Sequence, residues 1–429
     1  MAKAMANTEL CKGCRLCVGV CPKNAIIPLE TVNKKGYEII QVDDELCIGC
    51  GMCYKICPDY VFTVEKKRRI DVSESYKLLK GNEAIAEAAL RAGCRFYAGY
   101  PITPQSEILE YMADNMEKRG GVFIQGENEI ASMSMLYGAA ACGARCMSSS
   151  SGPGFDLKQE EISYLSAAEL PAVIVNAMRY GLGDGEITAG QDSYWVSTRG
   201  GGHGDKRLLV LAPASVQECA DLTYMAFDLA EKYRNVVEIL SDGAICQMIE
   251  KCYLPESKEH DMDKFDWTLK PRDQKKNKAY NVSYYEGYES YNQRMRNKIR
   301  TMFEEEQRWE NFMTEDAELV LVAYGISSRV CRSAVRQARK EGLKLGLIRP
   351  ITVWPYPRKA FAQLPESVKG FVSVEMSLTS QMGEDILLAT RSEKPLYGYL
   401  TSKDLPTVEG IIDYCKEIQA GNVQPMEVL

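Results

Sequence analysis

Short apolar runs alternate along most of the chain with longer segments in which apolar residues recur at helical spacing. The predicted strands are Phe96–Tyr100, Val122–Gln125, Arg145–Ser149, Ala172–Asn176, Leu208–Leu211, Val236–Leu240, Leu319–Tyr324, Lys344–Ile348 and Gly370–Glu375. The predicted helices are Gly81–Ala92, Gln105–Lys118, Glu127–Ala141, Val216–Lys232, Ser328–Lys340 and Ser380–Ala389. Strands that alternate with helices are typical of parallel α/β sheets. We expect two α/β domains, because the alternation stops near residue 254 and resumes near residue 317.

The chain divides into four regions that differ in composition and in predicted secondary structure. The predicted domains are a cysteine-rich, internally repeated segment over 1–66, an α/β domain over 70–253, a helical connector over 254–316, and a smaller α/β domain over 317–429. The basic run Lys66–Arg69 is typical of a linker. The connector is rich in Lys, Glu and Tyr, and its stretch Tyr291–Phe312 predicts one long polar helix.

Composition narrows the classes of protein to consider. A net charge of −7 gives no general attraction to nucleic acid. The longest apolar runs, such as Ala317–Tyr324, are far shorter than the roughly 18 residues that span a membrane, and the N-terminus lacks the pattern of a secretory signal. Eight of the 16 cysteines crowd between Cys11 and Cys57, while the others are scattered like reduced core thiols. We therefore expect a cytoplasmic protein that binds neither membranes nor nucleic acid.

Two cysteine runs near the N-terminus repeat the same spacing, each ending in Cys-Pro at Pro22 and Pro58. Runs of this kind hold two 4Fe–4S clusters, and the fourth cysteine of each run ligates the other cluster. The predicted ligand sets are therefore Cys11, Cys14, Cys17 and Cys57 for one cluster, and Cys47, Cys50, Cys53 and Cys21 for the other. Two zinc sites are the alternative, but zinc tolerates varied spacing and gives no reason for two complete copies. Residues 9–64 resemble bacterial two-cluster ferredoxins.

The larger α/β region carries motifs at the ends of its predicted strands. Tyr100–Glu107, with the sequence Tyr-Pro-Ile-Thr-Pro-Gln-Ser-Glu, follows a strand and opens a helix, where ligands of parallel sheets bind. The other motifs are Gly81–Ala92, Glu127–Ala131, Ser149–Gly154 and Ala177–Arg179. In this order they resemble the pyrimidine-binding domain of 2-oxoacid:ferredoxin oxidoreductases. Residues 317–420 resemble domain II of that family, which is similar to the C-terminal domain of transketolases.

The resemblance is closest to alpha subunits of the 3-methyl-2-oxobutanoate (branched-chain) enzymes, and it includes the loop Gly200–Asp205. It implies a thiamine-diphosphate domain of the pyrimidine type, a transketolase-C-like domain and a small α+β ferredoxin domain. The implied reaction is the oxidative decarboxylation of a 2-oxoacid with thiamine diphosphate and Mg²⁺. The acyl group passes to coenzyme A, and single electrons leave through iron–sulfur clusters to free ferredoxin.

The same resemblance assigns roles to three side chains. Glu129 matches the glutamate that hydrogen-bonds the N1′ ring nitrogen of the aminopyrimidine, which requires a desolvated carboxylate. Glu127 is a weaker candidate for that position. Thr103 matches a threonine aimed at the substrate's carboxylate or keto group. Arg179 matches an arginine poised over the same carboxylate, where a guanidinium offers a planar pair of donors.

Two further features are interpreted as turns. Gly183-Asp184-Gly185 copies the opening of a motif that binds the diphosphate of the coenzyme through magnesium. The motif needs an Asn some 25–30 residues later, and residues 209–216 contain none, so we interpret the copy as coincidental. His203, one of 2 histidines, is interpreted as a turn residue without a catalytic duty.

The segments expected for the diphosphate and for coenzyme A are not evident in this sequence. The resemblance assigns them to a beta subunit, which also carries the cluster nearest the coenzyme, and to a gamma subunit or domain. We therefore expect half a site on this chain and a heteromer doubled by two-fold symmetry. The alternatives within the class are 2-oxoglutarate, pyruvate and aryl-pyruvate substrates, because apolar pockets discriminate weakly. Outside this class of enzymes, the alternative is a pure electron carrier without a catalytic role.

Overall fold

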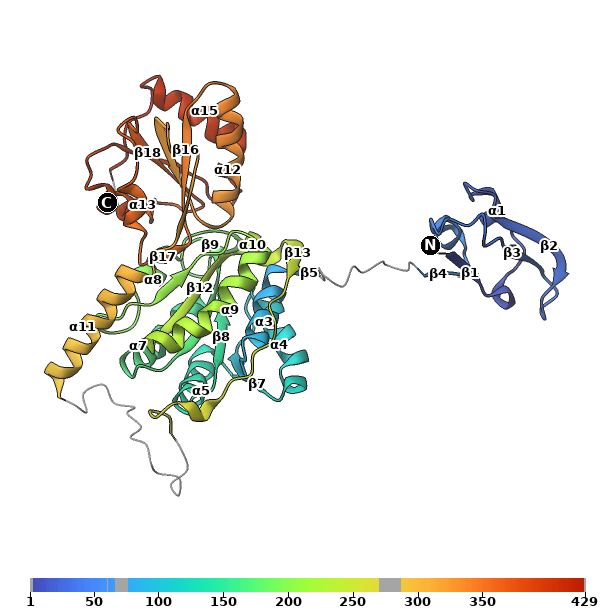
Figure 1. Ribbon diagram of the computed structural model, residues 1–429, viewed down its shortest axis with the longest axis horizontal. Coiled ribbons are helices and arrows are strands. Elements are labelled where there is room, and N and C mark those ends of the chain that lie inside the picture. Colours follow the sequence, from blue (N-terminus) through green and yellow to red (C-terminus); the bar gives the residue numbers. More distant parts are fainter. Residues whose placement is uncertain (1–2, 60, 66–75, 270–286, 428–429) are drawn as a thin grey trace. The chain divides into compact units, whose positions relative to one another are not determined.

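The computed structural model describes residues 3–59, 61–65, 76–269 and 287–427, and it separates the chain into two units, Met1–Ser75 and Tyr76–Leu429 (Figure 1). Each unit has its own hydrophobic core, so each is described by itself. The predicted linker Lys66–Arg69 lies outside the described residues.

The first unit is a small α+β fold, as predicted. It contains β1 (Lys3–Ala6) paired antiparallel with β4 (Phe62–Glu65), β2 (Ile26–Val32) paired antiparallel with β3 (Glu38–Val42), and the short helices η1 (Thr8–Leu10), α1 (Leu16–Gly19) and α2 (Met52–Ile56). Its core is formed by residues such as Ile26, Ile40 and Phe62. Each α-helix begins inside one of the cysteine runs, after a residue in the left-handed conformation, Arg15 or Gly51. The strands therefore frame two loops that carry the thiols.

The second unit begins with a large, mainly parallel sheet. Its strand order is β17 (Thr352–Trp354), β11 (Leu209–Leu211), β12 (Val236–Asp242), β9 (Ala172–Tyr180), β8 (Cys146–Ser150), β6 (Phe96–Gly99) and β7 (Val122–Gln125), with β10 (Glu186–Ala189) paired to β9. The strands β12, β9 and β8 are buried along almost their whole length, as expected for a parallel sheet with both faces covered. The six strands predicted in this region are all present.

Helices cover both faces of this sheet. The helices of the region are α3 (Gly81–Arg91), α4 (Ser106–Asn115), η2 (Glu117–Arg119), α5 (Glu129–Ala141), α6 (Gly152–Asp156), α7 (Gln159–Ala167), α8 (Tyr194–Thr198), α9 (Val216–Tyr233), α10 (Gly243–Gln247) and η3 (Met262–Lys264). α3, α4 and α9 pack into one core cluster, and α3 lies beside α9 (Figure 1), while α5 and α7 pack into the other. A separate pair, β5 (Tyr76–Lys80) and β13 (Ile249–Tyr253), runs antiparallel beside α9.

A second sheet follows, with the strand order β14 (Trp309–Phe312), β16 (Leu345–Pro350), β15 (Leu319–Val322), β18 (Gly370–Glu375) and β19 (Leu396–Leu400). Its helices are α12 (Gly325–Lys340), α13 (Arg358–Phe361), α14 (Gly383–Thr390) and α15 (Val408–Gln419). α12 and α15 pack together through residues such as Val335 and Ile411. β17 comes from this part of the sequence but pairs antiparallel with β11, which joins the two domains.

The predicted helix Tyr291–Phe312 is wrong at its C-terminal end. The helix α11 spans Tyr288–Glu305, and Trp309–Phe312 is the strand β14, paired antiparallel with β16. Tertiary pairing decides this segment, because the edge of the second sheet offers partners for its backbone groups. In the described parts of the chain, no helix is both long and apolar enough to cross a membrane.

Candidate active site and cluster ligands

Four adjacent strands of the large sheet, β9, β8, β6 and β7, end at the same edge, because they run parallel. The chain after β6 carries Thr103, and the helix that follows β7 starts at Glu129. The chain after β8 carries Ser151–Gly154, and Arg179 lies near the end of β9. The carboxyl edge of a parallel sheet is where ligands of α/β proteins bind. The fold therefore brings all three predicted site residues to one edge.

Glu129 is the first residue of α5, and its carboxylate is held inside the protein. Asn128 caps the helix by accepting a hydrogen bond from the Ala131 backbone nitrogen at 2.8 Å. Glu129 is 5% exposed, whereas Glu127 is exposed on the preceding loop. The carboxylate lies against Gly154, where an added Cβ would stand 2.3 Å from Glu129 Oε1. The desolvated position expected for the glutamate is that of Glu129, not that of Glu127.

Arg179 and Thr103 are in direct contact. The Arg179 guanidinium is buried, and its Nη1 donates to the Thr103 carbonyl oxygen at 3.3 Å. Its Nε is buried and has no partner among the residues that the structure describes, and it lies close to Gly152, where a Cβ would stand 2.6 Å away. The Thr103 side chain is exposed. Gln105 stabilises the loop that carries Thr103, because its side-chain Nε2 donates a hydrogen bond to the Tyr100 carbonyl oxygen at 2.9 Å.

The turn Gly183–Gly185 connects β9 to β10, which agrees with the interpretation of this motif as a turn. Sequence reasoning missed the role of its central residue. Arg179 Nη2 donates to Asp184 Oδ1 at 2.8 Å, although the Asp184 side chain is 94% exposed. A pair with one partner so exposed is weak, because water competes for it. The signal available in the sequence was the spacing of five residues between Arg179 and Asp184.

A buried polar group lies beside Glu129, on the segment that follows β8. Lys158 is fully buried, and its Nζ donates to Ser148 Oγ at 2.6 Å. Burial lowers the pKa of Lys158 to about 7, and the carboxylates of Glu129 and Glu161 oppose that shift. The hydroxyls of Ser150 and Ser151 are buried and have no hydrogen-bond partner in the described part of the chain. The edge of the sheet thus presents a carboxylate, two hydroxyls and a guanidinium nitrogen with unused hydrogen-bonding capacity.

His203 lies in the loop Gly200–Asp205, which rests on the start of α7. Gly201 and Gly202 both have positive φ, and a Cβ at either would collide with Gln159. The His203 side chain is exposed. Its interpretation as a turn residue stays a prediction.

The eight clustered cysteines fall into two groups in the first unit. Cys21, Cys47, Cys50 and Cys53 line one small cavity. Burial, and then the neighbouring thiols of Cys11, Cys14 and Cys57, raise the pKa of Cys17 to about 11. Backbone amides point at sulfur in both groups, from Ala25 to Cys21 at 3.2 Å and from Val61 to Cys57 at 3.4 Å. Each group therefore contains three thiols of one run and the last thiol of the other.

Across the described residues, no three histidine, cysteine, aspartate or glutamate side chains converge as the ligands of a single metal ion would. Amide-to-sulfur hydrogen bonds of the kind seen at Cys21 and Cys57 tune the potentials of iron–sulfur clusters.

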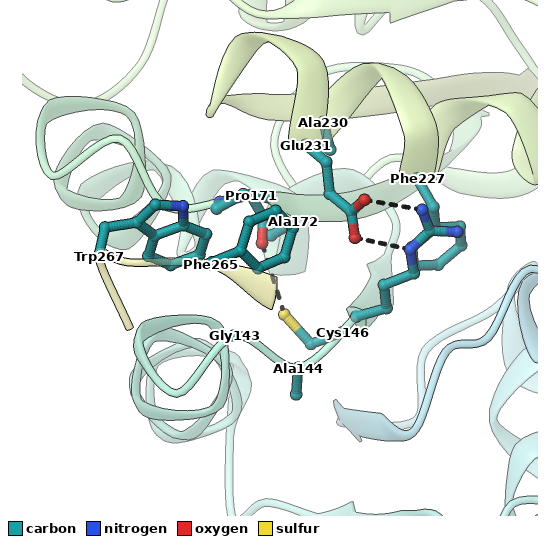
Figure 2. A pocket seen from close by; sticks show the side chains of 11 residues that line it. Gly143, Ala144, Cys146, Pro171, Ala172, Phe227, Ala230, Glu231, Phe265 and Trp267 are labelled. Carbon is teal, nitrogen blue, oxygen red and sulfur yellow. Dashed lines mark hydrogen bonds and ion pairs between the residues drawn. The ribbon is translucent and has the colours of Figure 1, made fainter. Parts of the chain in front are cut away.

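A separate cavity lies under the start of β8 (Figure 2). It is lined by Cys146, the Arg145–Glu231 pair and the rings of Phe265 and Trp267. Its volume of about 10 Å³ holds no more than a single water molecule. It is too small to receive a substrate.

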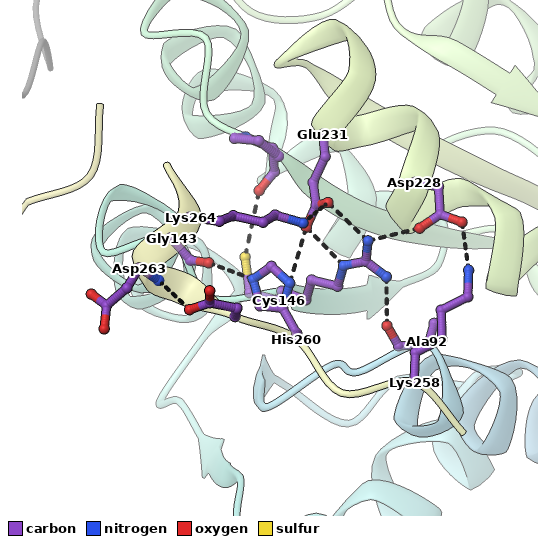
Figure 3. Close-up of polar contacts among 12 residues, drawn as sticks. Ala92, Gly143, Cys146, Asp228, Glu231, Lys258, His260, Asp263 and Lys264 are labelled. Carbon is purple, nitrogen blue, oxygen red and sulfur yellow. Dashed lines mark hydrogen bonds and ion pairs between the residues drawn. The ribbon is translucent and has the colours of Figure 1, made fainter. Parts of the chain in front are cut away.

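The charged residues around this cavity form a network that fastens the segment after β13 to the domain (Figure 3). Arg145 donates to Glu231 at 2.7 Å and to Asp228 at 2.7 Å. Lys258 pairs with Asp228 at 2.6 Å, and the His260 ring contacts the Gly143 carbonyl at 2.8 Å. Burial lowers the pKa of His260, so the neutral ring is favoured. These contacts hold the segment after β13 in place and so stabilise the fold.

Three family models match the chain. "Pyruvate flavodoxin/ferredoxin oxidoreductase, thiamine diP-binding" matches residues 87–314, and "Pyruvate:ferredoxin oxidoreductase core domain II" matches residues 317–403. A "4Fe-4S dicluster domain" matches residues 10–61. The last match favours iron–sulfur clusters over the zinc alternative. The chain therefore carries a 4Fe–4S dicluster domain and a thiamine-diphosphate-binding domain.

Proteins of known name are similar to most of this chain. The ketoisovalerate oxidoreductase subunit VorB of Methanothermobacter marburgensis is 49% identical over 73% of this chain and 90% of that protein. The 2-oxoglutarate synthase subunit KorA of Methanocaldococcus jannaschii is 36% identical over 73% of this chain and 94% of that protein. A solved 2-oxoglutarate:ferredoxin oxidoreductase from Magnetococcus marinus shares the fold, with a TM-score of 0.70 and 24% identity. The match covers 80% of this chain and 65% of that one, just under two thirds.

Proposed function

Because the chain belongs to the family of 2-oxoacid:ferredoxin oxidoreductases, we propose that it works as the alpha-type subunit of a heteromeric enzyme of that family. The reaction is the oxidative decarboxylation of a 2-oxoacid to acyl-CoA and CO₂, with electrons leaving to free ferredoxin. The observation that carries this proposal is the buried Glu129 carboxylate, which shares one sheet edge with Thr103 and Arg179.

The residues at this edge fit the aminopyrimidine of thiamine diphosphate. Glu129 supplies a desolvated carboxylate for a ring nitrogen, and the unpartnered hydroxyls of Ser150 and Ser151 offer further hydrogen bonds. Because Gly152 and Gly154 have no side chains, the space next to Arg179 and Glu129 stays open. When bound, the coenzyme supplies the carbanion chemistry that decarboxylation requires. Glu129 holds and shares the proton at the ring nitrogen, which needs a carboxylate fixed at hydrogen-bond distance.

Arg179 is proposed to receive the substrate's carboxylate. Among the described residues, its Nε has no hydrogen-bond partner and its Nη2 contacts the exposed carboxylate of Asp184 alone. A substrate carboxylate can replace Asp184 at little cost, because an ion pair in water contributes roughly 0–1 kcal/mol. A guanidinium then offers two parallel donors to the new carboxylate. Thr103, exposed beside it, is proposed to orient the substrate through its hydroxyl.

Branched-chain 2-oxoacids, with 3-methyl-2-oxobutanoate first, are the proposed substrates. The support is the higher identity to a subunit named for ketoisovalerate, 49%, than to a subunit named for 2-oxoglutarate, 36%. The same chemistry on 2-oxoglutarate, pyruvate or aryl-pyruvates is the alternative. A panel of 2-oxoacids, assayed with the co-purified complex and a viologen dye as electron acceptor, distinguishes them by kcat/KM.

The first unit is proposed to carry electrons. One 4Fe–4S cluster would be held by Cys11, Cys14, Cys17 and Cys57, and the other by Cys47, Cys50, Cys53 and Cys21. The support is the grouping of the thiols described above, in which each group contains one cysteine from the other run. Such clusters pass one electron at a time, which suits a ferredoxin acceptor. None of the 16 cysteines forms a disulfide bond, in line with a reducing, cytoplasmic setting.

Partner subunits are proposed to complete the site. An apolar patch is formed by Leu182 and Ile187 on the hairpin that carries Arg179 and by Leu378 on the loop after β18, and these side chains are 82%, 68% and 65% exposed. Asp192 links the patch, because it accepts hydrogen bonds from the backbone nitrogens of Gly181 and Leu378. Large apolar side chains so exposed are typical of surfaces covered by another subunit. A beta subunit would bring the diphosphate and Mg²⁺ site, and a gamma subunit or domain the coenzyme A site.

The test of the proposed function is a pair of variants, Glu129→Gln and Glu127→Gln, each in the co-purified complex. Gln at position 129 cannot share a proton as the carboxylate does, so we expect 2-oxoacid-dependent dye reduction to fall by about 10²–10⁴-fold with the clusters retained. Glu127→Gln is the matched control and should keep wild-type turnover. Wild-type turnover of Glu129→Gln would refute the assignment, and loss in the control alone would move the role to Glu127.

A further inference from the structure

A cavity of about 560 Å³, here named the arginine cavity, lies where α11 passes the end of α8, the strand β17 and the helices α13 and α14 (Figure 1). None of the residues assigned to the proposed active site lines it. Its volume falls in the range of about 300–1,000 Å³ that is usual for small-molecule sites. It is strongly basic, although the whole chain carries a net charge of −7. Its charged lining is one carboxylate, Asp385, and five guanidinium groups, those of Arg199, Arg207, Arg296, Arg300 and Arg358.

Only one of these guanidinium groups is neutralised by carboxylates of the described residues. Arg199 pairs through its Nε with Glu384 at 2.8 Å and through its Nη1 with Asp385 at 2.9 Å. Arg207 donates from its Nη1 to the carbonyl oxygen of Lys206 at 3.1 Å, which leaves its charge uncompensated. The single carboxylate of the lining is therefore already engaged, and the remaining guanidinium groups are available to an anion from outside.

Arg296 and Arg300 are four residues apart on α11, so their side chains lie on one face of that helix. Both are exposed, and neither forms a hydrogen bond or an ion pair within the ranges that the structure describes. Like charges at this spacing destabilise a helix. Stability therefore does not explain this pair, whereas an anion bound between the two groups would remove their repulsion.

The rest of the wall is apolar and partly aromatic. It contains Phe303 of α11, Trp354 of β17 and Leu388 of α14. The Arg358 guanidinium carbon lies 5.3 Å from the centroid of the Phe303 ring, so a cation already stacks on this wall. Flat heteroaromatic groups such as nucleobases stack on aromatic side chains and on guanidinium planes. The cavity thus offers a surface for a planar ring next to its positive charges.

A second cavity, of about 650 Å³, adjoins the first, because Phe303, Arg358 and Leu388 line both. An elongated ligand therefore has room to extend from one cavity into the other. The further charged residues of the second cavity are three cations and two carboxylates, namely Lys359, Arg391, Lys394, Glu304 and Glu393.

We propose that the arginine cavity binds a nucleoside polyphosphate, whose phosphates lie against Arg296 and Arg300 and whose base stacks on Trp354. Arginine is suited to phosphate, because its planar fork donates two parallel hydrogen bonds to the phosphate oxygens. A small anion such as inorganic phosphate would leave the aromatic wall uncovered. An acidic segment of a partner subunit is the competing occupant, but a concave site with an aromatic wall favours a small ligand. This inference does not depend on the proposed function.

The experiment titrates ADP and GDP into the full chain and into the co-purified complex, with the heat of binding as the readout. Arg300→Gln should raise Kd by about 10-fold or more, the effect of losing one charge-assisted hydrogen bond. The double variant Arg296→Gln/Arg300→Gln should raise it by about 100-fold. Arg336→Gln is the matched control, because Arg336 is an exposed arginine of α12 that lines neither cavity. It should bind like the wild type.

Two further measurements test the placement of the base. Pyrophosphate should bind about 10-fold more weakly than ADP, because it has no ring to stack on the wall. ADP should quench tryptophan fluorescence of the wild type. Trp354→Phe keeps an aromatic ring, so it should retain binding and lose most of that quenching. Unchanged quenching in Trp354→Phe would contradict the placement of the base.

The outcomes decide between the occupants of the cavity. The proposal is overturned if neither nucleotide binds to the wild-type complex, or if the double variant binds as tightly as the wild type. Binding to the full chain that is lost in the complex would show that a partner subunit fills the cavity, and it would overturn the proposal as well. The proposed function is decided separately by dye reduction, because Glu129→Gln should leave nucleotide binding unchanged.

Discussion

Substitution of Gly154 by Ala tests the geometry of the site most directly. Gly154 lies in α6 and does not use a positive φ, so the backbone accepts Ala there. The added Cβ would stand 2.3 Å from Glu129 Oε1 and 2.6 Å from Ser150 Oγ. Ordinary contacts of a Cβ begin near 3.4 Å, so the Glu129 oxygen must retreat by about 1 Å. The retreating atom is the one assigned to the coenzyme's ring nitrogen.

The cost of this retreat should appear in activity far more than in stability. A carboxylate at the end of a flexible side chain moves easily, and Ala favours a helix over Gly by up to about 1 kcal/mol. The misplacement of a catalytic group by about 1 Å can lower the rate by about 10²-fold. That factor corresponds to about 2.7 kcal/mol of lost transition-state stabilisation.

The assay is 2-oxoacid-dependent dye reduction by the co-purified complex, with thermal unfolding measured on the same samples. Gly138→Ala is the matched control, because Gly138 is exposed on α5 and a Cβ there meets no atom within 4 Å. We expect Gly138→Ala to keep wild-type turnover and Gly154→Ala to lose about two orders of magnitude with an unchanged unfolding temperature. Wild-type turnover of Gly154→Ala would show that Glu129 does not act from its observed position.

Two further predictions concern other parts of the chain. Cys57→Ala should damage the cluster that uses Cys11, because the Cys57 thiol lies in the group of Cys11, Cys14 and Cys17. Loss of the other cluster alone, measured by electron paramagnetic resonance, would contradict crossed ligation. Arg145→Met should lower the free energy of unfolding by about 3 kcal/mol or more, because it leaves Glu231 without its main partner. A loss below about 1 kcal/mol, measured by denaturant titration of the full chain, would show that the network in Figure 3 is dispensable for stability.

The sequence was sufficient for the layout of the site. Each motif follows a predicted strand, and parallel strands place their carboxyl ends together, so the convergence of Glu129, Thr103 and Arg179 could be predicted. The cysteine spacing was equally informative, because a repeated run of this kind places the last thiol of each run with the first three thiols of the other. The choice between Glu127 and Glu129 needed coordinates, since burial depends on which face of the loop meets Gly154.

Features set by contacts between distant segments could not be predicted. Trp309–Phe312 continues a polar helix in sequence, yet it forms an edge strand, because β16 offers it hydrogen-bond partners. Lys158 lies between α6 and α7 and looks like a surface residue, since nothing local shows that its side chain is buried against Ser148 on β8. The pair of Arg179 with Asp184 depends on the path of a hairpin, which the glycine-rich motif leaves open.

The second α/β domain contributes none of the predicted site residues, yet it holds the hairpin that carries one of them. Ala189 on β10 pairs with Arg179 on β9. Two residues later, the buried Gln191 donates to the Tyr324 carbonyl at 3.0 Å and accepts from Ser327 Oγ at 2.9 Å and from the Met376 backbone nitrogen at 3.0 Å. One side chain thus joins β10 to two segments of the second domain, with all of its polar atoms satisfied. The hairpin that carries Arg179 is therefore held by contacts from both domains.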